Sequence, residues 1–467
     1  NIITTIYYSK GFFMGLDNHI ESAMKGILKN PILSVLREIK ITNILKQSNF
    51  SKRNTGYPVL VVLLHFVYML VMNKRQSSFV KQSDDAYSKD TYYRFIQSKR
   101  YNWRKLLLLS SKALLAKIEP LQKNREPTLL IIDDTVEIKR GKQIEGSCKS
   151  IWCNKEHRPV NGINIVSLNF ADNHSTFQLD FAISMNKSKR KEVDTFTHTL
   201  HHRSNAHARR TETSKGKNKL ALEMLKRALD QGITANYLLV DSWYAKPNFI
   251  KEVTNEGIDV VARIANNNKI WNFKGKHKTL NCLYNALSKV KHKRSGYHGK
   301  IHYHYFGSIV EHHMLGKVKL VFLHTRKELI VLISTDLSLG AKEIIETYKK
   351  RWNIEQGYKD LREHFGLGKE ENRLYEALIA KITLSMFTYN LVSYINRIQH
   401  EPQTLGELFR DLECELETLA ISMQLFLEIL TKISEIENVV KENKDILTII
   451  AVLSSYTQKE LGFMCES

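Results

Sequence analysis

Acidic residues directly follow two apolar runs, and this pattern constrains the fold more than any other feature of the 467-residue chain. Asp133 and Asp134 follow the run Leu129–Ile132, and Asp241 follows the run Tyr237–Val240. Short apolar runs of this kind predict buried strands. Active sites of α/β proteins lie at the carboxyl ends of such strands, so two adjacent strands would bring these carboxylates together. An aspartate that only begins the next turn is the simpler interpretation of either position alone.

The residues around these acids alternate between strand and helix patterns. A helix is predicted over Lys217–Leu229, where Gly232 ends it, and a second one over Pro247–Asn255. The order β-β-β-α-β predicts an α/β domain. The predicted strands are Thr128–Ile132, Gly162–Phe170, Thr176–Ser184, Tyr237–Val240 and Ile258–Ile264.

Two further kinds of region flank or interrupt this domain. A Gly- and Lys-rich stretch over residues 265–327 predicts a β-rich insertion, and the residues up to about 122 and from 374 on are helical in pattern. The longest apolar run, Pro58–Met72, contains His65 and is shorter than the roughly 20 residues of a membrane span. This run therefore predicts a buried helix, and we expect no membrane as a partner. The strand candidates in and after the insertion are Lys300–Phe306, Val318–Phe322 and Leu329–Ser334.

The charge of the chain points to a polyanionic partner. It has 70 Lys plus Arg against 48 Asp plus Glu, a formal net charge of +22, and such an excess indicates nucleic acid more often than an ordinary solvated surface. The mixture of bases and aromatic residues in Tyr92–Arg104 suits contact with a DNA backbone, although an amphipathic helix with a wet basic face explains it equally well. Further basic blocks are Lys187–Lys191, Arg203–Lys219 and Lys289–Lys300.

A helix predicted over Ala341–His364 carries the third acid. At 100° per residue, four of its side chains fall within a stripe of about 60°, and Lys359 extends that stripe. Such a face offers one carboxylate for a metal among groups that hold phosphates, or else forms ordinary ion pairs along the helix. The four residues are Tyr348, Arg351, Glu355 and Arg362.

Together these motifs resemble the DDE insertion-sequence transposases of the hairpin-forming class, which carry a Tyr-Arg-Glu-Lys helix motif. The resemblance rests on the spacing Tyr-x2-Arg-x3-Glu-x6-basic, on an Asp-x-Thr strand end and on an Asp-Ser-Trp-Tyr strand end, and it covers roughly residues 125–395. The separations of 108 residues (241 − 133) and 114 residues (355 − 241) leave room for the β insertion of that family.

The resemblance implies a fold class and a division of the chain. The fold would be α/β, a ribonuclease-H-like catalytic core with a β-rich insertion, flanked by N- and C-terminal helical regions. The expected parts are a helical DNA-binding region 1–122, the first part of the core 123–264, the insertion 265–328, the second part of the core with the Glu helix 329–398, and a helical C-terminal region 399–467.

The resemblance also assigns roles to residues. Asp133, Asp241 and Glu355 would be the catalytic triad and would hold Mg²⁺, for which Mn²⁺ can substitute. The residues expected to bind DNA are Tyr348, Arg351, Lys359 and Arg362. Arg362 stands where the family usually has Lys, which replaces a point charge with a fork-shaped donor.

Two assignments stay open at this point. Asp134 is an alternative to Asp133 as the first ligand, because both precede Thr135. The family stacks a flipped base on a Trp late in the insertion, where this chain has none. The aromatic residues available there, for which core packing is the better explanation, are Trp271, Tyr303 and Tyr305.

The predicted function is a cut-and-paste DNA transposase that acts on double-stranded DNA, both transposon ends and target. A nuclease that does not join strands, or a non-catalytic DNA-binding protein derived from a transposase, are the alternatives. Cutting two ends together would require a homodimer in the DNA complex, for which the leucines of 405–419 are candidates. Five scattered cysteines and an N-terminus without a signal pattern predict a cytoplasmic, nucleoid-associated protein.

Overall fold

The computed structural model describes most of the chain between residues 31 and 414. The described residues are 31–50, 58–82, 87–122, 126–141, 143–153, 156–186, 200–265, 271–273, 275–298, 301–369, 372–399, 404–412 and 414. The basic block Lys187–Lys191 and most of the predicted C-terminal region 399–467 lie outside them. The chain forms two compact units, Asn102–Asn390 and the residues on either side of that segment.

The first unit is helical, as its apolar periodicity predicts. The predicted buried helix appears as α5, in which eight apolar side chains are buried. Phe50 stacks on Tyr101 with ring centroids 4.2 Å apart, and Tyr92 is fully buried. These aromatic rings therefore belong to a core rather than to a surface that grips DNA. The helices are α3 (Pro31–Glu38), α4 (Ile41–Gln47), α5 (Val59–Val71), α6 (Gln76–Gln82) and α7 (Lys89–Ile96).

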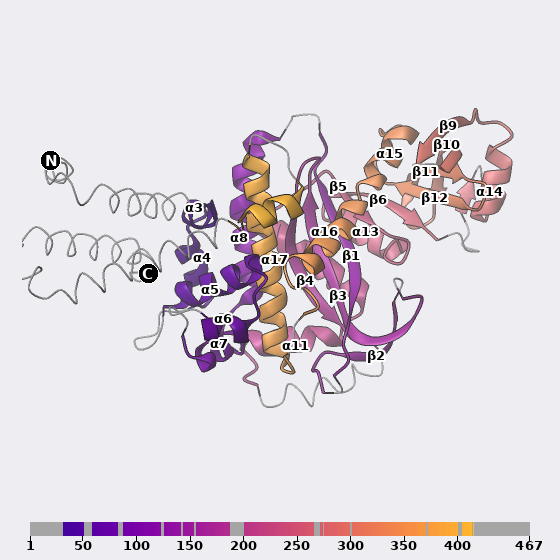
Figure 1. Ribbon diagram of the computed structural model, residues 1–467. Coiled ribbons are helices and arrows are strands. Elements are labelled where there is room, and N and C mark those ends of the chain that lie inside the picture. Colours follow the sequence, from indigo (N-terminus) through magenta and orange to yellow (C-terminus); the bar gives the residue numbers. More distant parts are fainter. Residues whose placement is uncertain are drawn as a thin grey trace, which may run out of the picture. The chain divides into compact units, whose positions relative to one another are not determined.

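The second unit is built on one sheet of 12 strands in the order β2-β3-β1-β5-β6-β12-β11-β10-β7-β8, with β4 paired to β3 and β9 to β10 (Figure 1). Strands β1, β5 and β6 run parallel, and β3 and β4 are antiparallel. The strands are β1 (Leu129–Ile138), β2 (Cys148–Cys153), β3 (Arg158–Ala171), β4 (Thr176–Ser184), β5 (Tyr237–Val240), β6 (Asp259–Ile264), β7 (Trp271–Phe273), β8 (Lys276–Lys278), β9 (Arg294–His298), β10 (Ile301–His312), β11 (Gly316–His324) and β12 (Leu329–Ser334).

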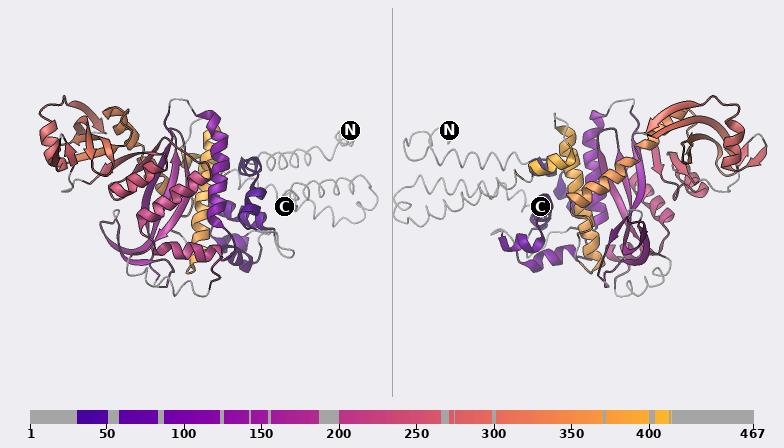
Figure 2. Two further views of the ribbon diagram at one scale, coloured as in Figure 1. Left: turned by 180° about the vertical axis from the view of Figure 1, so that it is seen from behind. Right: turned by 45° about the vertical axis from the view of Figure 1, so that its right-hand side comes forward.

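Helices cover both faces of the central strands (Figure 2). Helix α12 ends just before Gly232, whose φ of +77° suits a residue without a side chain. The helices are α8 (Trp103–Ile118), α11 (Asn205–Thr211), α12 (Lys217–Asp230), α13 (Pro247–Asn255), α14 (Leu280–Leu287), α15 (Ala341–Lys349), α16 (Trp352–Glu363) and α17 (Tyr375–Ile398), with short 3-10 turns at Glu119–Leu121 and Glu212–Ser214.

The predicted fold class is confirmed: a mixed α/β domain with a central sheet and flanking helices, in the manner of a ribonuclease-H-like core. The residues Leu129–Ile132 and Leu238–Val240 are fully buried, so the two central strands form the core itself. Near the residue 122 boundary, α8 lies in the same unit as the sheet, because Ser111 donates a hydrogen bond to the Gln178 carbonyl of β4 at 2.8 Å. The five-part division of the chain remains a prediction.

Helix α17 is the one described helix that is long and apolar enough to span a membrane. Its most apolar window is 94% buried inside the protein. Asn390, near its end, donates to the Gln178 carbonyl at 2.8 Å and accepts from the Gln178 amide at 2.7 Å. Burial and an internal polar contact are what a core helix requires, and so this helix gives no support for a membrane partner.

The insertion continues the sheet of the core. Strand β12 returns antiparallel beside β6, β11 pairs with β12, and β10 pairs with β11. Helix α14 packs near β8, and α15 contacts strands β10, β11 and β12 (Figure 1). The predicted β-rich character of this region is therefore correct, and its strands are longer than the sequence pattern suggested.

A buried ionic cluster joins the first helix of the unit to the sheet. Arg104 of α8 donates to Asp180 of β4 at 2.9 Å and to Glu212 at 2.6 Å. Arg209 also donates to Glu212 at 2.9 Å, and Arg227 of α12 donates to Asp180 at 2.7 Å. Arg104 was expected on a DNA-binding or wet surface; its guanidinium is instead directed inward, because these carboxylates supply its partners.

Candidate active site

The parallel pairing of β1 and β5 places two of the predicted acids side by side. The register pairs Ile132 with Val240, and the next residue on each strand is Asp133 and Asp241. Strand β5 ends at Val240, and Asp241 starts a turn in which its Oδ1 accepts the amide N–H of Trp243 at 2.9 Å. The two acids therefore occupy neighbouring backbone positions at the carboxyl end of the β5 strand.

Strand β1 does not end at the acids, which corrects the sequence prediction. It continues to Ile138 beside β3, with Asp133 opposite Ser167. Successive strand residues point to opposite faces, so Asp133, Thr135 and Glu137 share one face and Asp134 points to the other. The polar residues are tolerated inside the strand because α16 covers that face and supplies their partners.

The predicted helix Ala341–His364 is two helices, which is a second correction. Helix α15 ends at Lys349 and α16 begins at Trp352. At the junction the amides of Lys350 and Arg351 bond to carbonyls three residues back rather than four, so the turn tightens without leaving helical backbone angles. The side chains of the predicted stripe still converge: Arg351 lies 5.9 Å from the Tyr348 ring centroid.

Arg351 connects the first strand acid to the helix acid. Its Nη1 donates to Asp133 Oδ2 at 2.8 Å, and its Nη2 donates to Glu355 Oε1. The side chain of Arg351 is 17% exposed, that of Asp133 16% and that of Glu355 34%. One cation thus lies between two of the three predicted metal ligands, at the mouth of a half-buried site.

Two further residues of α16 fasten it to β1. Tyr358 Oη donates to the Asp133 carbonyl at 3.0 Å and lies 2.7 Å from Ser167 Oγ. Arg362 Nε donates to Glu137 Oε1 at 2.9 Å, and its Nη2 donates to Thr135. These contacts fix the helix that carries Glu355 against the strand that carries Asp133. Arg362 was expected to contact DNA, and here its guanidinium has protein partners.

The acids of the site outnumber the cations close to them. Burial raises the pKa of Asp133 to about 7, Arg351 opposes that shift, and the neighbouring Asp134 and Asp241 add to it. Burial also raises the pKa of Asp241, with a further contribution from Asp134. Clustered acids with raised pKa values are a signature of functional sites.

Asp134, the alternative first ligand, has a different environment. Its Oδ2 accepts from Lys217 Nζ at 2.6 Å and its Oδ1 accepts from Tyr244 Oη at 3.0 Å. Lys217 belongs to α12, so α12 and α16 approach β1 from opposite faces. Asp134 is neutralised on the α12 side, whereas Asp133 faces Arg351 and the helix of Glu355.

The candidate ligands are of the chemical type that a hard divalent cation prefers. Among the residues that the structure describes, no group of three His, Cys, Asp or Glu side chains is arranged to hold a metal ion, and Arg351 occupies the space between Asp133 and Glu355. The neighbouring ligands are all carboxylate oxygens, which Mg²⁺ and Mn²⁺ prefer. A guanidinium already bound by two of them shows that the site attracts positive charge.

The other two predicted DNA-binding residues, Lys359 and Tyr348, differ in their surroundings. Lys359 is exposed on α16, and burial raises the pKa of Tyr348. The three aromatic candidates of the insertion are buried, as core packing requires: Trp271, Tyr303 and Tyr305 are 4%, 6% and 6% exposed. Sequence reasoning gave no role to Tyr358, and it noted Lys217 only within the basic block Arg203–Lys219 and Tyr244 only within the Asp-Ser-Trp-Tyr motif. A Tyr three residues after Glu355 was a signal for Tyr358, because that spacing returns to the same helix face.

A comparison with protein families agrees with this geometry. Residues 61–278, just under half of the chain, match the family model described as DDE superfamily endonuclease. The matched segment contains Asp133 and Asp241 and ends before the insertion strand β9. No curated protein matches the chain. The family match, with the mixed sheet and the paired carboxylates, supports a DDE transposase-like family for this chain.

Proposed function

We propose that this protein is a cut-and-paste DNA transposase that binds transposon ends, cleaves them through a hairpin intermediate and joins them to target DNA. One observation carries the proposal: Asp133 and Asp241 lie side by side at the end of the β1–β5 pair, and Arg351 links Asp133 to Glu355 of α16. The family match supports nuclease-type chemistry on DNA with divalent metals. Homodimerisation in the DNA complex and association with the nucleoid are part of the proposal.

Asp133, Asp241 and Glu355 would hold the metal ions. Bound there, Mg²⁺ ions would activate a water and stabilise the departing 3′ oxygen of a phosphodiester. Asp133 is the better first ligand than Asp134, because it shares Arg351 with Glu355 while Asp134 is paired with Lys217. If these acids held metal ions, the guanidinium of Arg351 would be available to contact a DNA phosphate, with Tyr348 beside it.

The chemical sequence has four steps. Water first attacks the phosphorus at the transposon end, which leaves a 3′-OH and a 5′-phosphate. That 3′-OH then attacks the opposite strand, forming a new phosphodiester hairpin and releasing the 3′-OH of the flanking DNA. Hydrolysis reopens the hairpin, and the freed 3′-OH attacks target DNA in the same manner.

The test uses the full chain with Mg²⁺ and DNA carrying candidate terminal repeats located by footprinting. We expect nicked and hairpin products on denaturing gels and joined products when target DNA is added. The matched control is Asp241→Asn, which keeps the shape of the side chain and removes its charge. Cleavage without joining would identify a nuclease that does not transfer strands, and full activity in Asp241→Asn would reject the proposed site.

A further inference from the structure

The backbone pairing between β1 and β5 stops one residue before the two acids. Its last paired residues are Ile132 and Val240, so the pairing itself does not fix Asp133 and Asp241, which lie beyond it. A shift of the turn after β5 would therefore change the separation of the two carboxylates. Functional sites require their side chains to be held to within about 0.5 Å of the productive geometry.

Each carboxylate follows the backbone that carries it. Asp241 Oδ1 accepts the amide N–H groups of Trp243 at 2.9 Å and of Tyr244 at 3.3 Å, so this carboxylate moves with the turn after β5. Asp133 and Asp134 are adjacent on β1, and Asp133 Oδ1 accepts the amide N–H of Asp134 at 2.8 Å. A contact between Asp134 and the turn would therefore set the position of one acid relative to the other.

The hydroxyl of Tyr244 makes that contact. Its side chain is fully buried, and its Oη donates to Asp134 Oδ1 at 3.0 Å. Burial raises the pKa of Tyr244 well above its usual range, so the hydroxyl keeps its proton and stays a donor. The turn that carries Asp241 is thus bonded directly to the residue beside Asp133.

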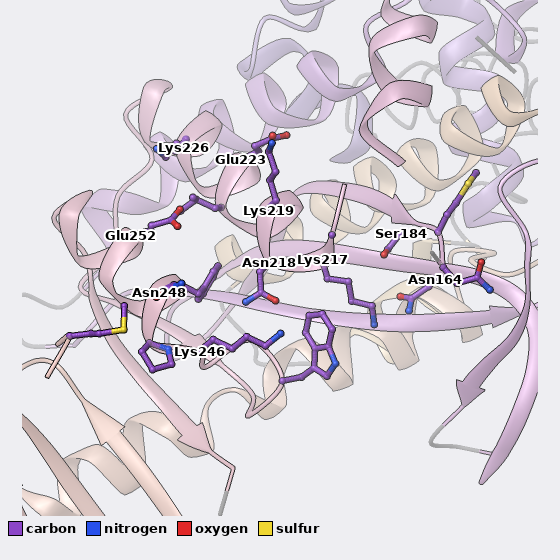
Figure 3. A pocket seen from close by; sticks show the side chains of 18 of the residues that line it. Asn164, Ser184, Lys217, Asn218, Lys219, Glu223, Lys226, Lys246, Asn248 and Glu252 are labelled. Atoms are coloured by element: carbon purple, nitrogen blue, oxygen red, sulfur yellow. The ribbon is translucent and has the colours of Figure 1, made fainter. Parts of the chain in front are cut away.

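Helix α12 holds both ends of this contact. Lys217 Nζ donates to Asp134 Oδ2 at 2.6 Å, and Asn218 Nδ2 donates to the carbonyl of Tyr244 at 3.2 Å. Lys217 and Asn218 are the first two residues of α12, where they line a groove that the turn after β5 also lines (Figure 3). The contact between Tyr244 and Asp134 is therefore supported from the strand, the turn and the helix.

We propose that Tyr244 is a positioning residue that sets the separation of Asp133 and Asp241 through its hydrogen bond to Asp134. The hydroxyl acts on the proposed ligands from outside, as the hydrogen-bonding partners of ligand residues do in metal sites. This inference rests on the proposed function and deepens it, because it names the group that holds the two strand acids in place.

The test replaces Tyr244 with Phe, which keeps the buried ring and removes only the hydroxyl. The matched control is Tyr237→Phe at the other end of β5, where the hydroxyl also donates to a carboxylate, Asp336 Oδ2, at 2.9 Å. Mn²⁺ binding to the full chain without DNA is followed by electron paramagnetic resonance, and Tm is measured in EDTA. We expect Tyr244→Phe to bind Mn²⁺ about 10-fold more weakly than the wild type, and Tyr237→Phe to bind it like the wild type.

Single-turnover cleavage separates positioning from substrate binding. Tyr244→Phe should lower the cleavage rate at saturating DNA by about 10-fold, and its affinity for DNA in EDTA should stay that of the wild type. A double variant tests whether the effect passes through Asp134. Asp134→Leu removes the acceptor of the hydroxyl, so adding Tyr244→Phe to it should weaken Mn²⁺ binding by less than about 2-fold further.

The outcomes separate the positioning role from the proposed function. If Tyr244→Phe binds Mn²⁺ and cleaves DNA like the wild type, or if Tyr237→Phe loses as much as Tyr244→Phe, the positioning role is overturned and the proposed function stands. A lower Tm with unchanged Mn²⁺ affinity would also overturn it, because it would show a role in stability alone. A further loss of about 10-fold in the double variant would overturn the path through Asp134. If the wild type neither binds Mn²⁺ nor cleaves DNA, the proposed function and the positioning role are both overturned.

Discussion

Two ionic clusters within the same unit shift the pKa of their central carboxyl groups in opposite directions. In the buried cluster around Asp180, burial alone would raise its pKa, but Arg104, Arg227 and Arg209 lower it overall. In the candidate active site, burial raises the pKa of Asp133 to about 7 despite Arg351. The first cluster supplies more cations than its central acid needs, and the second supplies fewer. The difference indicates that one cluster holds the fold together and the other is left to be completed by a ligand.

The largest effect we expect is a difference in cleavage rate between variants of the two adjacent acids of β1, Asp133 and Asp134. Asp133→Asn should lower the rate of DNA cleavage by about 10³-fold or more, because losing a metal ligand removes several kcal/mol of transition-state stabilisation. Asp134→Asn should lower it by only about 10-fold, through the loss of the Lys217 contact. Single-turnover cleavage with Mg²⁺ measures both. A greater loss in Asp134→Asn would transfer the role of first ligand to Asp134.

The next effect concerns stability and the buried cluster. Asp180→Ala should lower the free energy of unfolding by about 3–5 kcal/mol, because it leaves buried arginines without their partner. Urea denaturation at pH 7 measures the loss. A loss below about 1 kcal/mol would mean that the remaining carboxylate, Glu212, compensates the arginines by itself.

The third effect is a gain in stability when Asp133, a proposed catalytic acid, is replaced. The pKa of Asp133 in the folded protein, about 7, lies above the value of about 3.9 in the unfolded chain. Ionisation therefore costs stability as the pH rises from about 4 to 7, and the cost is complete above 7. Without metal, Asp133→Asn should be more stable than the wild type by about 1–3 kcal/mol at pH 8, and the gain should disappear near pH 4.

Asp180→Asn is the control for this pH dependence, since its pKa is lowered and the sign reverses. Its carboxylate contributes stability above the unfolded value of about 3.9, and that contribution is lost as the pH falls through the folded value. The variant should be less stable than the wild type at pH 7 and approach it only in acid. Parallel pH profiles for the two variants would refute the contrast between the clusters.

The smallest effect tests whether Arg351 takes the place of a metal ion. Arg351→Ala removes the cation between Asp133 and Glu355, so Mg²⁺ should stabilise this variant more than the wild type, by about 1 kcal/mol in thermal unfolding. Arg362→Ala is the matched control, because Arg362 contacts Glu137 and Thr135 and neither Asp133 nor Glu355. An unchanged Mg²⁺ effect in Arg351→Ala would show that the guanidinium and the metal do not compete.

Much of the fold follows from local sequence patterns. Strand β4 over Thr176–Ser184, strand β5 over Tyr237–Val240 and helix α13 over Pro247–Asn255 have the predicted bounds. Strand β2 was missed because it does not alternate: its register on β3 shifts between Cys148 and Ile151, and Ser150 has a positive φ. A bulge of this kind removes the period of two on which a prediction depends.

The acids of the candidate site and the bases of its helix could be proposed from the sequence, but the protein partners of its cations could not. The strand acids follow apolar runs, and a pattern of that kind is visible in a sequence. The partner of Lys217 is 83 residues away at Asp134, and that of Arg362 is 225 residues away at Glu137. Contacts across such separations depend on how helices pack on the sheet, which also explains why β1 continues through polar residues and why the Glu helix tightens at Lys350.

The pairing of β12 with β6 has a mechanical consequence. Strand β12, which directly follows the insertion, is joined to β6 by a ladder of paired residues from Val331 to Ser334, and β6 in turn pairs with β5, the strand that precedes Asp241. A force on the outer strands of the insertion, β10 and β11, is therefore transmitted to the core through the backbone pairing of β12 with β6. Movement of the insertion away from the acids as one body would require breaking that pairing.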